Sequence, residues 1–362
     1  MDKITVTSPL LPPLEELTPY LEDIWQRKWL TNSGHYHQEL EAALCEYLDV
    51  PYVSLFSNGT LALITALQSL GLKGEVITTP YTFVATAHAI KWNGLTPVFV
   101  DIDPDTYNLD VGHIEAAITE RTCAIVPVHV YGMPCNNEAI EALARKYNLK
   151  VIYDAAHAFG VTENGHSVLN YGDLSILSFH ATKAYSTIEG GAVVCKTLEQ
   201  KEQLDKLKNF GFESESVISQ CGINAKLNEV QAAFGLVTLK HIDDAIERRK
   251  GVASFYYEKL GSVEGIKLLT PEDNISWNYS YFPIFIDETA FGKSRDELFS
   301  LLKENNILAR KYFYPLVTDF ELYHSSEQEF PCAKKVSEQV LCLPIHADLS
   351  TEDMELIVGL IL

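Results

Sequence analysis

Long apolar segments are missing from this sequence of 362 residues. The longest stretch without a charged residue, 50–72, is interrupted by Pro51, Asn58 and Gly59, so it lacks the roughly 20 consecutive apolar residues of a membrane-spanning helix. A secretory signal has a basic segment followed by an apolar run, and neither is found in the first residues, MDKIT. We therefore expect a cytoplasmic protein with no membrane partner.

Cysteine pairs and positive charge are also scarce. The seven cysteines are odd in number and widely spaced, without a C-x-x-C pair, which argues against a disulfide framework and a structural zinc site. His35 and His37 have no nearby third ligand at metal-site spacing, so we predict no metal.

The formal net charge of the chain is -21. Nucleic-acid binding needs a surface rich in basic residues, which a chain this acidic does not favour. The binding of a small anion is compatible with this charge, because a helix N-terminus can hold a phosphate locally.

What the sequence does contain is an alternation of short apolar runs and helical patterns between residues 40 and 200. Strands are expected at 52–56, 75–78, 96–100, 122–127, 150–153, 174–179 and 192–195. The clearest helices between them are expected at 61–70, 83–93 and 137–147. This alternation predicts an α/β fold with a mostly parallel, doubly wound sheet, which binds ligands at the carboxyl ends of its strands.

The segments outside this block predict a helical N-terminal arm and a smaller second domain. The arm has expected helices at 12–29 and 34–47. The tail has an expected helix at 229–260, a strand at 276–286, and helices at 294–305 and 351–362. Because this mixture is typical of an α+β domain, we divide the chain into 1–245, the arm plus the large domain, and 246–362, the small domain.

A lysine and an aspartate each follow a predicted strand of the large sheet. Lys183 lies between two strands, and Asp154 ends the strand at 150–153. The lysine amine could form a Schiff base with an aldehyde cofactor, and the aspartate could pair with a pyridinium nitrogen. Plainer interpretations exist, because loop lysines are usually surface residues and Asp154 could cap a helix that begins at Ala155.

Small polar residues follow another strand and open the next helix: Ser57, Asn58, Gly59 and Thr60. Free N–H groups, a glycine and hydroxyls at the positive end of a helix dipole are the components of a phosphate site. A plain helix cap explains the same residues. Ser178 could add a further hydroxyl.

Two rings are candidates for contact with a flat cofactor. Phe83 follows another strand end and could stack on the cofactor, although a single aromatic residue more often belongs to the core. His157 could cover the other face or touch a phenolic oxygen, and a hydrogen-bonded structural histidine is the alternative. Neither a phosphate-binding glycine motif nor a G-x-S-x-G elbow occurs, so kinase, dehydrogenase and hydrolase interpretations lose their main support.

Taken together, these motifs resemble the DegT/DnrJ/EryC1/StrS family of sugar aminotransferases. The motifs that carry the resemblance are SNGT at 57–60, DAAHA at 154–158, SFHATK at 178–183 and EGG at 189–191. The resemblance extends over nearly the whole chain, through GINAKLNEVQAA at 222–233 and RKYFYPL at 310–316.

The resemblance implies a fold-type-I enzyme that depends on pyridoxal 5'-phosphate, and a homodimer with its sites at the subunit interface. Lys183 would hold the cofactor covalently and transfer protons, which requires a depressed pKa for its amine, and Asp154 would hold the pyridine nitrogen. The other implied residues bind the phosphate (Gly59, Thr60, Ser178 and, from the partner subunit, Asn224), flank the ring (Phe83 and His157) and hold a nucleotide-sugar (Arg310 and Tyr314).

The resemblance also implies a reaction. A related dehydratase branch has histidine at the position of Lys183, so we expect transamination, in which L-glutamate gives its amine to the cofactor and the cofactor passes it to a keto-sugar. The segments 182–191 and 9–14 are most similar to members that act on dTDP-4-keto-6-deoxyglucose. Departures from the family pattern at 184–186, Ile223 and Ala225 leave the 3-keto isomer and UDP- or GDP-linked sugars open. The alternative class is a catalytically silent regulatory protein, which would be expected to lack Lys183 or Asp154.

Overall fold

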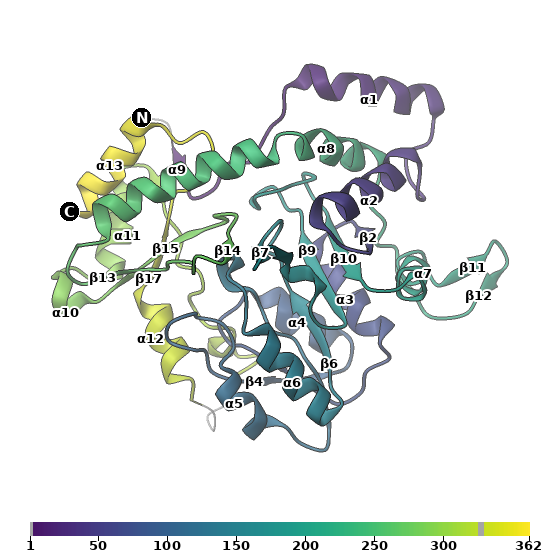
Figure 1. The fold of residues 1–362 in the computed structure, drawn as a ribbon, viewed down its shortest axis with the longest axis horizontal. Helices are drawn as coiled ribbons and strands as arrows, with labels where there is room; N and C mark the ends of the chain where they lie inside the picture. The colour runs from purple at the N-terminus through teal and green to yellow at the C-terminus, as the bar shows by residue number, and fades with distance from the viewer. Residues whose placement is uncertain (1–2, 325–328) are drawn as a thin grey trace.

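The computed structural model describes residues 3–324 and 329–362, and its largest element is a seven-stranded sheet (Figure 1). The strands, in their order across the sheet, are β2 (Tyr52–Phe56), β10 (Gly191–Cys195), β9 (Leu174–Ser178), β6 (Lys150–Asp154), β5 (Thr122–Ile125), β3 (Glu75–Thr78) and β4 (Thr96–Phe99). β10 runs antiparallel to both of its neighbours, while β9, β6, β5, β3 and β4 pair in parallel. The predicted mostly parallel sheet is confirmed.

Both faces of this sheet are buried. On β10, Ala192 and Val194 belong to one hydrophobic cluster, whereas Val193 and Cys195 belong to another, as expected for a strand whose successive side chains point to opposite faces. The helices of this part of the chain are α3 (Gly59–Ser69), α4 (Val84–Trp92), α5 (Val111–Ile114), α6 (Asn137–Tyr147) and α7 (Leu198–Leu207). The structure therefore confirms the doubly wound α/β class.

The N-terminal arm packs against a helix from the middle of the chain. Its helices are α1 (Leu14–Arg27) and α2 (His35–Leu48), and their neighbour in Figure 1 is α8 (Glu229–Leu239). The Glu229 carboxylate accepts the backbone N–H groups of Tyr36 and His37, both at 2.9 Å. A carboxylate at a helix N-terminus satisfies N–H groups that have no partner within the helix, so Glu229 fastens α2 to α8.

The last third of the chain forms a second, smaller layered unit. An antiparallel sheet of β13 (Ile266–Leu268), β15 (Phe282–Ile286) and β17 (Val340–Leu343) packs with α9 (Ile242–Leu260), α11 (Arg295–Glu304) and α13 (Thr351–Ile361). Within α9, Ile242 packs in the cluster of the large sheet, and Tyr256 packs in that of the small sheet. The division at residue 245 stays a prediction.

The remaining elements are short. They include β1 (Ile4–Thr5), which pairs with β16 (Ile307–Leu308), the three-stranded sheet of β7 (Thr162–Glu163), β8 (His166–Ser167) and β14 (Ile275–Ser276), the hairpin β11 (Phe212–Ser214) and β12 (Val217–Ile218), and the helices α10 (Glu288–Phe291) and α12 (Pro331–Gln339). Figure 1 shows the hairpin projecting from the body of the molecule. Among the described residues, we find no helix with the length and apolar character needed to cross a membrane.

Two predicted elements are wrong. The helix expected at 229–260 is two helices, because α8 ends at Leu239, the N–H groups of Lys240 and His241 make bonds of i to i−3 type, and α9 begins after His241. The strand expected at 276–286 is interrupted, because Tyr279 has a φ of 51° and the side chain of Asn278 donates to the carbonyl oxygens of two other residues. Neither break is marked by glycine or proline, so the sequence pattern gave no sign of it.

Candidate active site

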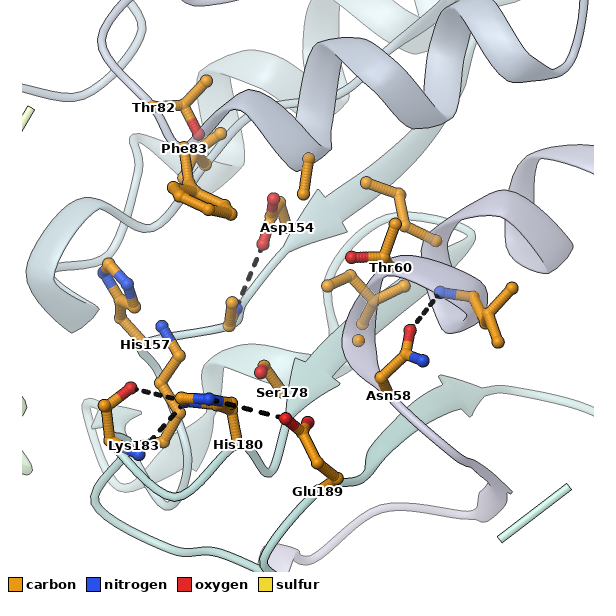
Figure 2. A pocket seen from close by; sticks show the side chains of 18 of the residues that line it. Asn58, Thr60, Thr82, Phe83, Asp154, His157, Ser178, His180, Lys183 and Glu189 are labelled. Carbon is orange, nitrogen blue, oxygen red and sulfur yellow. Dashed lines mark hydrogen bonds and ion pairs between the residues drawn. The ribbon is translucent and has the colours of Figure 1, made fainter. Parts of the chain in front are cut away.

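A cavity of about 800 Å³ lies at the carboxyl ends of β6 and β9 (Figure 2). Its position is the one where open α/β sheets bind ligands. The sequence-predicted residues that line it are Gly59, Thr60, Phe83, Asp154, His157, Ser178, Lys183 and Arg310. The fold therefore brings together eight residues that lie between positions 59 and 310 of the sequence.

Lys183 projects into this cavity from the connection between β9 and β10. A turn after β9 is closed by the bond from the Lys183 N–H to the His180 carbonyl at 2.9 Å, and the side chain is half-buried. Burial lowers the pKa of the Lys183 amine to about 8, and the charge of Arg310 lowers this pKa further, against the opposing effect of Asp154. The predicted depression of the pKa is confirmed, so a useful fraction of the amine is neutral and nucleophilic near neutral pH.

Asp154 is the last residue of β6 and is buried. Its Oδ2 accepts the hydroxyl of Thr86 at 2.8 Å, and its Oδ1 accepts the backbone N–H of Ala156 at 3.2 Å. Burial raises the pKa of Asp154, while these two hydrogen bonds and the charge of Lys183 lower it. No helix begins after Asp154, since the following residues form a turn closed by the Ala158 N–H on the Ala155 carbonyl. The helix-cap interpretation of Asp154 is therefore wrong.

The N-terminus of α3 faces the end of β9. Asn58 caps the helix, since its Oδ1 accepts the Leu61 N–H at 2.8 Å, so the plain-cap interpretation is confirmed for this residue. The first N–H groups of a helix have no partner within it, and the cap leaves those of Gly59 and Thr60 beside the cavity. A Cβ atom on Gly59 would lie 2.9 Å from Cβ of Ser178. This close approach places the Ser178 side chain next to the positive end of the helix, as a phosphate site requires.

Phe83 and His157 present rings at the other end of the cavity. Phe83 is the N-cap residue of α4, and its side chain is 57% exposed although it is apolar. His157 is buried and stacks on Phe313, with 6.0 Å between ring centroids. Burial lowers the pKa of His157 well below its ordinary value, and its Nδ1 has no hydrogen-bond partner in the part of the chain that the structure describes. The alternative of a fully hydrogen-bonded structural histidine is thus not supported.

Two predicted residues lie outside the cavity lining. Tyr314 is 43% exposed, and its ring lies 4.6 Å from the guanidinium carbon of Arg295. Asn224 is exposed in the segment between the β11–β12 hairpin and α8. Neighbouring residues of the predicted RKYFYPL segment, Tyr312 and Phe313, line the cavity instead.

Sequence reasoning gave no role to several residues of the site. His180 lies between Thr182 and Glu189, with its Nδ1 2.8 Å from the Thr182 hydroxyl and its Nε2 3.5 Å from Glu189 Oε1. These residues belong to the SFHATK and EGG motifs, so the signal was present in the sequence. Thr86, whose hydroxyl donates to Asp154, lies in none of these motifs. The sequence gives only its spacing: it follows Thr82 by four residues, which places the two side chains on one helix face.

The site combines a nucleophilic amine, a buried carboxylate, an anion-binding helix end and flat rings. Each of these matches one part of a phosphorylated pyridine aldehyde: the aldehyde carbon, the ring nitrogen, the phosphate and the ring faces. The buried Nδ1 of His157, a residue that lines this cavity, has no hydrogen-bond partner among the described residues. Residues of this type, on this sheet, define a pyridoxal-phosphate enzyme of fold type I.

Comparison with known proteins gives the family. Residues 14–362 match the DegT/DnrJ/EryC1/StrS aminotransferase family, so the chain belongs to this family and is an aminotransferase whose cofactor is pyridoxal 5'-phosphate. It is 56% identical over 360 residues to a dTDP-4-amino-4,6-dideoxy-D-glucose transaminase of Shigella dysenteriae, covering 99% of this chain and 98% of that protein. A protein of the same name from Escherichia coli is 52% identical over 366 residues, with the same coverage.

A solved structure supports the same assignment of fold. The crystal structure of DesI, determined in the presence of its TDP-sugar product, superposes with a TM-score of 0.96 at 34% sequence identity and covers 99% of this chain and 92% of that one. The predictions of fold class, family, aminotransferase activity and cofactor are confirmed.

Proposed function

We propose that this aminotransferase moves the amino group of L-glutamate to C4 of dTDP-4-keto-6-deoxy-D-glucose. The observation that supports this substrate is the 56% identity, over nearly the full length of both chains, to a protein named for dTDP-4-amino-4,6-dideoxy-D-glucose. A transaminase interconverts an amine and the ketone at the same carbon, so the keto form of that sugar carries its ketone at C4. Glutamate is proposed by analogy with the family.

Lys183 is the proposed catalytic residue. Pyridoxal phosphate, when bound, supplies the electron sink that lets a proton leave the carbon next to the amine. The Lys183 amine lies in the cavity with a pKa lowered to about 8 by burial. A group with such a pKa can hold a proton and release it near neutral pH, as a general acid and base must. Lys183 would therefore both anchor the cofactor and carry the proton between the substrate carbon and the cofactor.

The remaining cofactor contacts follow from the placement of the side chains. Asp154 would pair with the pyridine nitrogen, because its buried carboxylate opens on the cavity. Gly59, Thr60 and Ser178 would hold the phosphate at the start of α3. Phe83 and His157 would contact the ring.

The nucleotide-sugar would enter from the side of the small domain. Arg310 lines the cavity and donates to the hydroxyl of Tyr312, so its charge faces the space that an anionic diphosphate would occupy. Tyr314, which lies outside the cavity, would contact a more distant part of the ligand. The exposed Asn224 would complete the phosphate site of a partner subunit in a homodimer. Sedimentation equilibrium tests the homodimer: we expect twice the chain mass of 40.5 kDa, and a monomer at working concentration would contradict it.

The compartment proposed for the enzyme is the cytoplasm. All seven cysteines are free thiols in the structure, and reduced thiols are typical of that compartment.

The experiment that tests the substrate compares four acceptors with the cofactor-loaded enzyme and glutamate. They are dTDP-4-keto-6-deoxyglucose, its 3-keto isomer, and the UDP- and GDP-linked 4-keto-6-deoxy sugars, with 2-oxoglutarate release and the mass of the sugar as readouts. We expect turnover to be fastest with the first acceptor. Turnover of the 3-keto isomer alone would exclude the C4 assignment. No release of 2-oxoglutarate from glutamate would favour the silent regulatory class, which the presence of both Lys183 and Asp154 disfavours.

A further inference from the structure

Two threonines that have no assigned role form a chain of hydrogen bonds to Asp154. The hydroxyl oxygen of Thr86 lies 2.8 Å from Asp154 Oδ2, and that of Thr82 lies 2.9 Å from the hydroxyl oxygen of Thr86. The exposed fraction is 0% for Thr86 and 4% for Thr82, so water competes little with these bonds. The chain runs from the cavity wall, which Thr82 lines, through the first turn of α4 to the end of β6.

The number of protons on these groups fixes the direction of the chain. A threonine hydroxyl has one proton to donate, and an ionised carboxylate can only accept. Thr86 must therefore give its proton to Asp154 whenever Asp154 is ionised, and its oxygen is then free to accept the proton of Thr82. Hydrogen bonds linked in this way polarise one another, and a bond to a charged acceptor is stronger than one to a neutral acceptor.

Asp154 needs this support because it is buried. Burial disfavours the ionised form, and the largest opposing contribution is the hydrogen bond from Thr86, followed by the N–H of Ala156 and the charge of Lys183. The contribution of Lys183 varies with the state of its amine, whereas the Thr86 hydroxyl is always available. In addition, Thr86 holds Oδ2 and Ala156 holds Oδ1, so both oxygens of the carboxylate are fixed in orientation.

We propose that Thr86, supported by Thr82, is a positioning residue that keeps Asp154 ionised and oriented toward the pyridine nitrogen of the cofactor. The proposal rests on the proposed role of Asp154 and is independent of which sugar is the substrate. Under this proposal, α4 contributes to the site in two ways. Phe83, its N-cap residue, lines the cavity, and Thr86, one turn later, donates to Asp154.

The test compares Thr86→Val, Thr86→Ser, Thr82→Val and Asp154→Asn with the wild type. Two quantities are measured without any sugar: the dissociation constant of pyridoxal phosphate by equilibrium dialysis, and the pH dependence of the visible absorption of the lysine-bound cofactor. Valine preserves the shape of threonine but removes the hydroxyl, and serine preserves the hydroxyl. Calorimetric melting of each cofactor-free variant verifies that it is folded.

For Thr86→Val we expect a roughly tenfold rise in the dissociation constant, the low end of the value of a hydrogen bond to a charged group. We also expect the visible absorption of the lysine-bound cofactor to change at a higher pH than in the wild type. Without the Thr86 hydroxyl, Asp154 holds the proton on the ring nitrogen less firmly, and a less protonated ring withdraws less electron density from the bond to lysine. Thr82→Val should shift both quantities in the same direction by less, and Thr86→Ser should restore values close to the wild type.

Three results would overturn the proposal. If Thr86→Val retains the wild-type absorption profile and cofactor affinity while Asp154→Asn loses them, Thr86 has only a packing role. If Thr86→Ser is as impaired as Thr86→Val, the methyl group and not the hydroxyl matters. An Asp154→Asn variant that behaves like the wild type would remove the proposed role of Asp154 and the Thr86 proposal with it, without bearing on the sugar.

Discussion

Gly59, at the start of α3, lies so close to Ser178, at the end of β9, that a Cβ atom on Gly59 would be 2.9 Å from Cβ and 3.2 Å from Cα of Ser178. Atoms at these distances overlap, so any side chain at position 59 must push the helix end away from the strand. Glycine at position 59 allows this close approach, which brings the Ser178 side chain next to the start of α3, where we propose that the phosphate binds.

We therefore expect Gly59→Ala to weaken the binding of pyridoxal phosphate by roughly tenfold or more, because the proposed phosphate contacts depend on this geometry. Equilibrium dialysis of the cofactor measures the effect. The matched control is Gly251→Ala in α9, where a Cβ atom has no neighbour within 4 Å and where alanine favours the helix. Equal cofactor affinity in the two variants would show that the start of α3 does not bind the phosphate.

The lowered pKa of Lys183 predicts how the rate of cofactor loading depends on pH. Only the neutral amine attacks an aldehyde, and burial lowers the pKa of this amine to about 8, from about 10.4 for an ordinary lysine. The loading rate should therefore rise with pH and level off above a midpoint near 8, as followed by stopped-flow absorption of the cofactor-free protein mixed with pyridoxal phosphate. A midpoint near 10 would mean that the amine is not desolvated before the cofactor arrives.

Arg310 affects both the cavity charge and Lys183. Its charge lowers the pKa of Lys183, so Arg310→Ala should move the loading midpoint to higher pH. The same change should raise the KM for the nucleotide-sugar roughly tenfold to a hundredfold, the effect of losing a charge-assisted hydrogen bond. The rate at which the enzyme converts glutamate should change less. The control is Arg248→Ala, whose exposed side chain pairs with Asp244. An unchanged KM would exclude Arg310 as a sugar contact.

A partly buried group of charges next to Ser54 of β2 is predicted to contribute to stability. The Nζ atom of Lys208 lies 2.7 Å from Asp205 and 3.4 Å from Glu41, and its side chain is 2% exposed. Removal of Lys208 leaves Lys201 as the cation that contacts both carboxylates, so Lys208→Met should lower the free energy of unfolding by up to about 3 kcal/mol in chemical denaturation. The exposed pair of Lys146 and Glu115 provides the control, and Lys146→Met should change stability much less.

The same group predicts a dependence on pH. Burial opposes the ionisation of Glu41, but the hydrogen bond with His37 and the charges of Lys208 and Lys201 outweigh burial and hold its pKa well below the ordinary value. A lowered pKa gives stability that is present above the pKa of the unfolded chain, about 4.3 for glutamate, and is lost as the pH falls below it. The advantage of the wild type over Glu41→Gln should therefore shrink between pH 6 and pH 3. A constant difference would contradict the assignment.

Local sequence patterns predicted the large sheet well because its strands are short β-branched runs bounded by turn residues. The bounds expected for 52–56, 75–78 and 137–147 coincide with β2, β3 and α6. The interruption at Tyr279 was missed because it is accompanied by a tertiary contact, the donation from Asn278 to the His157 carbonyl. The break between α8 and α9 was missed because its i to i−3 bonds have no glycine or proline to mark them in the sequence. α7 was also missed, although its capping box of Thr197 and Gln200 is visible in the sequence.

Lys183 and Asp154, which the sequence placed in a motif and after a strand, both line the cavity. The Thr86 hydroxyl could not be assigned to Asp154 from the sequence, because 68 residues separate the two and only the parallel pairing of the strands brings them together. Likewise, the sequence could not show that Tyr312 and Phe313 line the cavity while Tyr314 is not part of the lining, since all three belong to one short segment.

The most direct test of the account is the visible absorption of the protein with pyridoxal phosphate, recorded before and after the addition of L-glutamate, for the wild type and for Lys183→Ala. The account predicts a yellow band in the wild type that fades with glutamate as 2-oxoglutarate is released, and no lysine-bound band in the variant. A band that persists unchanged in Lys183→Ala, or a wild-type band that glutamate does not alter, would contradict the assignment of Lys183 as the residue that carries the cofactor through transamination.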